Sequence, residues 1–204
     1  GIKEFSTILK ENGIKTFAVT EVDDIAQLKE VLDNEDILVM RSTCIEDEAR
    51  LVAENGCIAT IGSLNSAAVM DKVSKDLGVK TKCYLKIDTG MGRYGFMPSE
   101  VESAIRCYDF ENLDFIGAYT HFSSAFTNTE LTKTQLALFK DTMAQIEKTG
   151  KKVGILHAAN SPALLNVSDV CLDSVRVGSA FTGRVITQSK TKLNRLGRLE
   201  AEVI

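Results

Sequence analysis

The segment 86–96 (KIDTGMGRYGF) concentrates residue types that could do chemistry, because it supplies two cations, one acid and three glycines. Lys86 stands between Leu85 and Ile87, so strand alternation points it away from both and into the interior of a barrel. A lysine in such an interior needs a counter-charge or must lose its own charge. The plainer alternative is an ion pair between Lys86 and Asp88 on a solvated strand end.

Three further side chains could reach the same rim. His121 and Arg176 each come at the end of an apolar, β-branched run, and the carboxyl ends of parallel strands meet at one edge. A single histidine there is more often structural, but two titratable groups beside an anion-binding loop favour an active site. Arg93 is either a surface residue or a planar clamp for a carboxylate or phenolate. The direction of His157 stays open.

Two short loops have the composition of an anion-binding site. Asn160 and Ser161 offer backbone amides and a hydroxyl, and Gly178, followed by Ser179, lets an anion approach the main chain because it has no Cβ. In a barrel of eight strand-helix units, the loops after strands seven and eight often hold a phosphate group. Taken alone, each of these loops is also an ordinary turn.

The elements that must position these residues alternate between strand and helix. Apolar runs typical of buried parallel strands are separated by segments with the spacing of one apolar helix face, which indicates an α/β fold. The strands are expected at residues 16–20, 36–41, 57–61, 82–88, 115–121, 153–159 and 171–177. Capping-box spacing predicts helix starts at Thr20, Thr43, Ser99 and Thr127, and glycines predict helix ends at Gly13, Gly56, Gly78 and Gly150.

A helix predicted for residues 3–12 has no strand before it, so the chain opens inside a strand-helix unit. Seven strands and this leading helix add up to the eight units that close a barrel. We therefore expect a (β/α)8 TIM-like barrel that is incomplete, with seven of its eight strands present. Residues 198–204 alternate like the first strand of a further domain.

Composition excludes several classes of function. The chain has 204 residues, a formal net charge of −4 and a pI near 5.3. We therefore expect no nucleic-acid or membrane partner, and we expect a small-molecule ligand instead. No stretch is apolar enough for a signal peptide or membrane helix, which favours a cytoplasmic protein. The five cysteines and the acidic residues show no metal-ligand spacing, so no metal is expected.

Four motifs together resemble the alanine racemase family in order and spacing. They are the segments 86–95, 120–122, 159–161 and 175–178. The resemblance implies a pyridoxal-phosphate enzyme on an eight-stranded barrel, followed by a β-rich C-terminal domain. It assigns residues 1–197 to the barrel domain, truncated at its N-terminus, and residues 198–204 to the start of the second domain.

The resemblance also implies roles for the residues singled out above. Asn160, Ser161, Gly178 and Ser179 would bind the cofactor and its phosphate, and Arg176 would donate to the pyridine nitrogen. His121 would bridge Arg176 to a tyrosine supplied by a partner subunit. Arg93 would reach the cofactor phenolate and the substrate carboxylate, and Lys86 would be the lysine that is often carbamylated and then orients Arg93.

Several positions depart from the family pattern. No lysine occupies the Schiff-base position and the partner tyrosine has no counterpart, so this chain by itself is expected to be inactive. Val177 stands where proline is common, and Ser179 and Thr182 replace an apolar residue and an aromatic one. These changes leave serine or another amino acid open as the substrate.

The leading interpretation is a homodimeric racemase that interconverts L- and D-alanine and supplies D-alanine as a peptidoglycan precursor. A non-catalytic pyridoxal-phosphate-binding barrel is a second interpretation. A third is an unrelated barrel enzyme for phosphorylated substrates, such as an aldolase, in which Lys86 itself forms the Schiff base.

Overall fold

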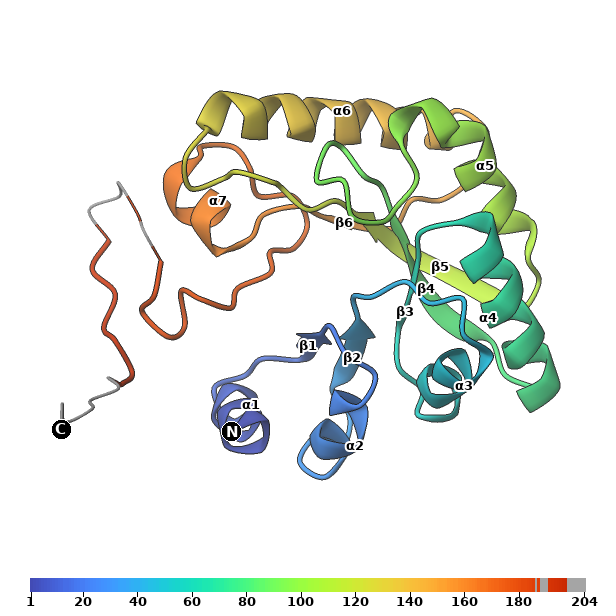
Figure 1. The fold of residues 1–204 in the computed structure, drawn as a ribbon, viewed down its shortest axis with the longest axis horizontal. Helices are drawn as coiled ribbons and strands as arrows, with labels where there is room; N and C mark the ends of the chain where they lie inside the picture. The colour runs from blue at the N-terminus through green and yellow to red at the C-terminus, as the bar shows by residue number, and fades with distance from the viewer. Residues whose placement is uncertain (186, 188–190, 198–204) are drawn as a thin grey trace, which may run out of the picture.

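The computed structural model describes residues 1–185, 187 and 191–197, in which helices and strands alternate (Figure 1). The predicted strand at 198–204 lies outside the described residues. The helices are α1 (Ile2–Glu11), α2 (Asp24–Lys29), α3 (Glu46–Glu54), α4 (Leu64–Leu77), α5 (Val101–Arg106), α6 (Thr129–Glu147) and α7 (Ser161–Asn166). The strands are β1 (Thr16–Val19), β2 (Asp36–Val39), β3 (Ala59–Ile61), β4 (Thr81–Lys86), β5 (Leu113–Tyr119) and β6 (Ile155–His157). Two short 3-10 turns, Pro98–Glu100 and Cys107–Asp109, flank α5.

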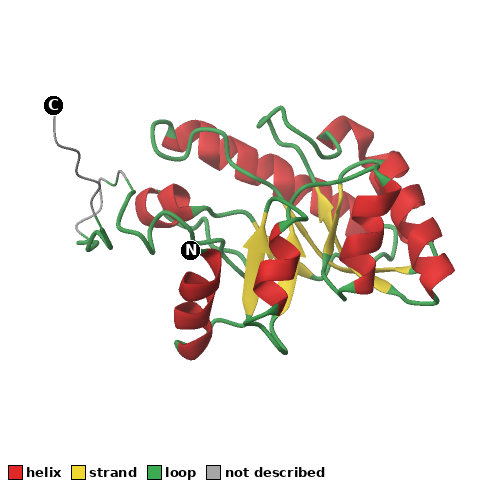
Figure 2. Cartoon of the chain, turned by 60° about the horizontal axis from the view of Figure 1, so that its bottom comes forward, coloured by secondary structure: helices red, strands yellow, loops and turns green. Residues whose placement is uncertain are grey.

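All strand pairs are parallel and follow chain order. β1 pairs with β2, and β3, β4, β5 and β6 form a second sheet in that order. A single bridge between Leu38 and Ile58 continues the order from β2 towards β3. The strands form an arc with helices on its outer side, and within the described residues the arc does not close into a barrel (Figures 1 and 2).

The predicted strand at 171–177 is a correction to the expected fold. Among the described residues there are six strands rather than seven, and this segment runs beside β6 with only one bridge, between His157 and Ser174. The carboxylate of Asp173 accepts the backbone N–H of Leu156 at 2.8 Å, and the amides of Asp173 and Ser174 both bond to the Leu156 carbonyl. The side chain of Asp173 therefore takes the place of a regular ladder bond, which stops a strand from extending.

The two faces of the strands have different surroundings. On the outer face Leu85 and Ile87 are fully buried against apolar side chains of α2 to α6. On the inner face Tyr84 and Tyr119 belong to a separate apolar cluster with Leu38 and Ile58. Burial of both faces explains why these runs are apolar throughout rather than alternating.

Two glycines set the spacing between β5 and β6. A Cβ at Gly117 would lie 2.2 Å from the Ile155 carbonyl oxygen and 2.3 Å from the Tyr84 ring. A Cβ at Gly154, whose φ is +63°, would lie 2.1 Å from the carbonyl oxygen of Ile116. Only glycine fits at either position. Because these two residues have no side chain, β6 can pack closely against β5 and the Tyr84 ring.

Candidate active site

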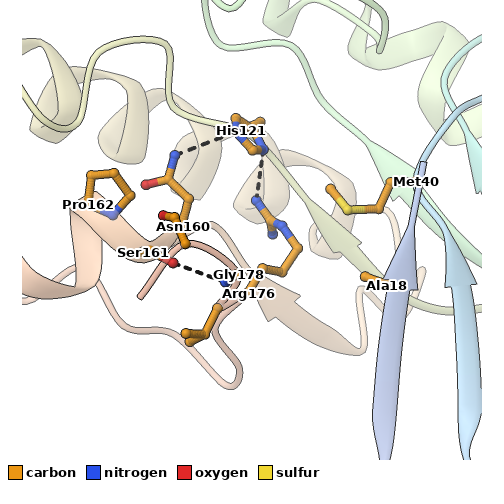
Figure 3. A pocket seen from close by; sticks show the side chains of 10 residues that line it. Ala18, Met40, His121, Asn160, Ser161, Pro162, Arg176 and Gly178 are labelled. Atoms are coloured by element: carbon orange, nitrogen blue, oxygen red, sulfur yellow. Dashed lines mark hydrogen bonds between the residues drawn. The ribbon is translucent and has the colours of Figure 1, made fainter. Parts of the chain in front are cut away.

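A cavity of about 340 Å³ opens at the carboxyl ends of the strands (Figure 3). Ala18 of β1 and Met40 after β2 line one side, and His121, two residues beyond β5, lines another. The rest of the lining comes from the loop that begins α7 and from the segment after residue 175. These residues are Asn160, Ser161, Pro162, Arg176, Val177, Gly178 and Ser179.

Arg176 enters this cavity with its guanidinium held on several sides. Nη2 donates to the carbonyl oxygens of Thr120 at 2.7 Å and Ala158 at 3.1 Å. Nη1 donates to Nδ1 of His157 and to the His157 carbonyl, the latter at 3.3 Å. The guanidinium carbon also lies 5.0 Å from the centre of the Tyr119 ring. These contacts fix the plane of the guanidinium.

One donor of Arg176 has no partner in this arrangement. Its Nε is buried, and no group in the described part of the chain accepts its hydrogen. An unsatisfied buried N–H is costly, so the site favours a ligand with an acceptor atom there. An unprotonated pyridine nitrogen is such an acceptor, and Arg176 therefore fits the ring of pyridoxal phosphate.

Two histidines flank Arg176. Nδ1 of His121 lies 3.4 Å from Nη2 of Arg176, and its Nε2 lies 3.5 Å from the amide nitrogen of Asn160 (Figure 3). Arg176 can only donate, and a neutral imidazole accepts at one nitrogen, so acceptance at Nδ1 places the His121 proton on Nε2. The long contact with the Asn160 amide nitrogen then joins two donors, and the Nε2–H of His121 remains available.

The electrostatics of this cluster favour neutral imidazoles. Burial, reinforced by the charges of Arg176, Arg93 and Lys86, lowers the pKa of His121 to about 4. Burial and the Arg176 charge lower the pKa of His157 even further. Burial also lowers the pKa of Arg176 to about 10, which still leaves it charged at neutral pH.

Ser161 forms the centre of an anion cradle. Its Oγ accepts the backbone N–H groups of Gly178 at 3.0 Å and Ala180 at 3.2 Å. A Cβ built at Gly178 would meet nothing within 4 Å, so the space beside its backbone is open. A phosphate oxygen that replaced Ser161 Oγ as their acceptor would meet two converging amides, and the Ser161 hydroxyl could then turn to act as a third donor. Asn160 instead caps α7 by accepting from Ala163 at 3.1 Å.

Lys86 is buried on the inner face, as strand alternation predicts, but it does not line the cavity. The residue is 1% exposed, and its Nζ donates to the Ile87 carbonyl at 2.8 Å and lies 5.6 Å from the centre of the Tyr119 ring. Burial lowers the pKa of Lys86 to about 8; the Asp88 charge opposes this shift, and two arginines add to it. At neutral pH Lys86 therefore stays mostly charged, with a larger neutral fraction than an exposed lysine has.

The alternative of an ion pair between Lys86 and Asp88 is wrong. Asp88 turns away and accepts four backbone N–H groups at 2.7 to 3.1 Å. They belong to residues 90–93 and use both carboxylate oxygens. Burial alone would raise the pKa of Asp88, but these bonds and the Lys86 charge outweigh it and lower that pKa. Asp88 therefore shapes the loop that carries Arg93.

Arg93 lies apart from the cavity. Its side chain is exposed on the loop after β4 and stacks on Tyr94, with the guanidinium carbon 5.0 Å from the ring centre. The structure thus gathers His121, Asn160, Ser161, Arg176, Gly178 and Ser179 around one cavity and leaves Arg93 and Lys86 outside its lining.

Sequence reasoning missed several parts of the site. The sequence leaves the direction of His157 open, and by residue type it does not point to Met40, Ala18 or the amide of Ala180. Met40 follows directly on a strand, so its position at the strand end was a usable signal. Ala180 contributes only backbone, which leaves no signal in residue type.

Comparison with known proteins identifies the family of this chain. Residues 1–185 match the family model of the alanine racemase N-terminal domain. The alanine racemase of Methanococcus maripaludis is 34% identical over 187 residues, which cover 90% of this chain and 50% of that protein. A structure of alanine racemase from Clostridium difficile 630 in complex with cycloserine superposes with a TM-score of 0.89 at 27% identity, covering 96% of this chain and 55% of that one.

A structure of the alanine racemase from Bartonella henselae with covalently bound pyridoxal phosphate shares the fold, with a TM-score of 0.83 at 24% identity over 96% of this chain and 56% of that one. The fold is thus that of the N-terminal domain of alanine racemases. This chain belongs to the alanine racemase family. It spans about half the length of the curated relatives it matches. An unrelated barrel of the aldolase kind, the third interpretation of the sequence, is therefore wrong.

Proposed function

We propose that the cavity binds pyridoxal phosphate. The phosphate would lie against Ser161 and the amides of Gly178 and Ala180, with Ser179 beside them, and the ring nitrogen would accept from Arg176. The observation that carries this proposal is the unpartnered Nε of Arg176, in a cavity whose lining also includes the anion cradle. The two features match the two acceptor ends of one ligand.

Bound pyridoxal phosphate supplies an electron sink that acidifies the α-hydrogen of an amino acid attached to it. Arg176 keeps its own proton, so it donates a hydrogen bond to the ring nitrogen without protonating it. A partner of this kind weakens the sink, compared with a carboxylic acid. That difference favours return of the proton to the same carbon, which is racemisation, over transamination.

The remaining predicted residues have supporting roles in this proposal. His121 would remain neutral and offer its Nε2–H to an acceptor on the open side of the cavity. The lowered pKa of Lys86 increases the neutral amine that can add to carbon dioxide, with loss of a proton, to form a carbamate. The resulting anion would replace a buried cation by a counter-charge for Arg93.

For the whole protein we propose the racemisation of alanine by a cytoplasmic homodimer, with a small amino acid as substrate and D-alanine for peptidoglycan as its product. The family relationship and the donor set of the cavity support this proposal. The net charge of −4 gives no support to a nucleic-acid or membrane partner. In the described part of the chain, no helix has the length and apolar character needed to span a bilayer.

Cofactor binding is tested by titrating the chain with pyridoxine 5′-phosphate and following heat or fluorescence. We expect Ser161→Ala to weaken binding about tenfold, since one hydroxyl donor to a charged phosphate is lost. Ser103→Ala, on α5, is the matched control and should bind as the unaltered chain does. Equal affinity of the Ser161 variant and the unaltered chain would refute the phosphate site.

Racemisation is tested on the full reading frame that contains these residues. With pyridoxal phosphate added, the circular dichroism of an L-alanine solution should decay to zero, and Arg176→Met should slow the decay strongly. Decay with L-serine alone would move the substrate assignment to serine. Cofactor binding without turnover of any amino acid would instead identify the non-catalytic alternative.

A further inference from the structure

His157 is a buried polar group to which the proposed function gives no role. It is the last residue of β6 and is 3% exposed. Its ring lies almost parallel to the Tyr119 ring, at a centroid distance of 4.8 Å and an interplanar angle of 7°. The Tyr84 ring meets it edge-on at 4.7 Å. These two aromatic contacts define the plane of the imidazole.

We propose that His157 is a positioning residue that fixes the orientation of Arg176 through its Nδ1. The consequence for ligand binding rests on the proposed function, because it concerns the pyridine nitrogen. The inference itself rests on the hydrogen bond from Nη1 of Arg176 to Nδ1 of His157. Since arginine only donates, Nδ1 is the acceptor and the ring proton is on Nε2.

The two terminal nitrogens of Arg176 have different acceptors. The carbonyls of Thr120 and Ala158 hold Nη2. Among the described residues, Nη1 bonds only to His157, through Nδ1 and through the backbone carbonyl at 3.3 Å. Without the imidazole acceptor, Nη1 would keep one long hydrogen bond, and the guanidinium could rotate about the contacts of Nη2.

Rotation of the guanidinium matters because its plane carries Nε. The three nitrogens and their hydrogens are coplanar, so the position of Nη1 also sets the direction of the unpartnered Nε–H. His157 thus aims the donor that would meet the ring nitrogen without contacting a ligand itself. Residues that hold a ligand-binding side chain in this way determine how accurately that side chain is oriented towards the ligand.

The test compares two substitutions with two probes. His157→Asn keeps an acceptor near the position of Nδ1, whereas His157→Phe keeps the ring contacts with Tyr119 and loses the acceptor. The probes are pyridoxine 5′-phosphate and its 1-deaza analogue, in which a C–H group replaces the ring nitrogen. Titration of the full chain with each probe measures the dissociation constants.

We expect His157→Phe to bind pyridoxine 5′-phosphate about tenfold more weakly than the unaltered chain, because one well-directed hydrogen bond to the ring nitrogen is lost. The same variant should bind the 1-deaza analogue as well as the unaltered chain does. His157→Asn should stay within about threefold for both probes. A general structural defect would weaken both probes equally. Equal weakening, or no weakening, would overturn the proposal.

A second measurement is independent of any ligand and of the folding of the Phe variant. The chain has two histidines, so a long-range ¹H–¹⁵N spectrum shows only two imidazoles. We expect His157 to carry its proton on Nε2 at neutral pH, and a proton on Nδ1, or a charged ring, would overturn the proposal. If the unaltered chain binds neither probe, the proposed function fails, while this spectrum still decides the role of His157.

Discussion

The two arginines predicted for the site are held in opposite ways. Arg176 uses both terminal nitrogens in hydrogen bonds to buried backbone carbonyls and His157, and only its Nε lacks a partner in the described structure. Arg93 is exposed, and its guanidinium stacks on Tyr94. The loop of Arg93 is fixed through its backbone, by Asp88, rather than through the arginine side chain.

This difference shows how far the chain organises its site. One half of the site, Arg176 with the groups of β5, β6 and the neighbouring segment that hold it, is pre-organised. This Arg176 half can therefore direct the Nε–H donor before any ligand binds. The Arg93 half has a rigid loop but an exposed side chain. A ligand or another protein surface must therefore complete the position of Arg93, whereas Arg176 needs neither.

The largest effect is expected from Arg176→Met. The substitution leaves the carbonyls of Thr120 and Ala158 and Nδ1 of His157 without their donor, which should lower the free energy of unfolding by about 3 kcal/mol. Urea denaturation followed by circular dichroism measures the change. A loss below about 1 kcal/mol, the effect of a typical surface substitution or smaller, would show that Arg176 is not caged as described.

A somewhat smaller effect is expected from Asp88→Ala. Four backbone N–H groups lose a charged acceptor, and because the site is only partly buried we expect a loss of about 2 kcal/mol in unfolding free energy. Asp88→Asn keeps one carbonyl oxygen and should lose about half as much. If the two variants were equally stable, the carboxylate would not be what holds the loop.

Mild acid should weaken the Arg176 half through its histidines. The folded pKa values of His121 and His157 lie below the ordinary value of 6.5. The unfolded chain therefore binds protons first as pH falls, and stability is lost below about pH 6.5, by on the order of 1 kcal/mol per histidine at pH 5. Denaturation at pH 7 and pH 5 measures this. In an NMR titration His121 should titrate near pH 4, and a midpoint near 6.5 would contradict the arrangement.

The smallest effect is expected from Arg93→Ala. An exposed cation stacked on one ring contributes about 0.5 kcal/mol, so the unfolding free energy should change by that amount or less. Binding of pyridoxine 5′-phosphate to the chain should not change, because Arg93 is not part of the cavity lining. A loss of binding comparable with that of Arg176→Met would remove the contrast between the two arginines.

Much of the fold could be predicted from the sequence because its signals are local. Apolar runs located the six observed strands, and alternation placed Lys86 opposite Leu85 and Ile87. The four glycines predicted to end helices all have positive φ, at 61° to 88°. The order of strands followed from the parallel alternation of strand and helix, which leaves few possible topologies.

Helix starts were predicted less well than helix ends. The helices expected after Thr20, Thr43 and Thr127 begin instead after Asp23, Ile45 and Asn128. The helix expected after Ser99 begins at Val101, following a 3-10 turn. No side chain caps the helices that follow Asp23 and Ile45, whereas Asn128 accepts the Leu131 N–H, so the capping-box spacing did not locate these three starts.

The parts of the fold and the site that could not be predicted depend on tertiary contacts. The interaction of Asp173 with the Leu156 amide, which breaks the expected last strand, joins residues far apart in the sequence. The aromatic contacts of His157 likewise come from β4 and β5. The direction of Arg93 could not be predicted, since an exposed side chain on a loop has no local constraint.

The close approach of β5 and β6 through Gly117 and Gly154 has a consequence for mutational surveys of this family. Neither glycine bears a functional group or lies in the cavity lining. Yet any larger residue at either position would push apart the strands that end at Tyr119 and His157. A survey scored by activity would rank both glycines with the reactive residues. Their contribution, however, is the absence of a side chain, which lets the two strands approach each other.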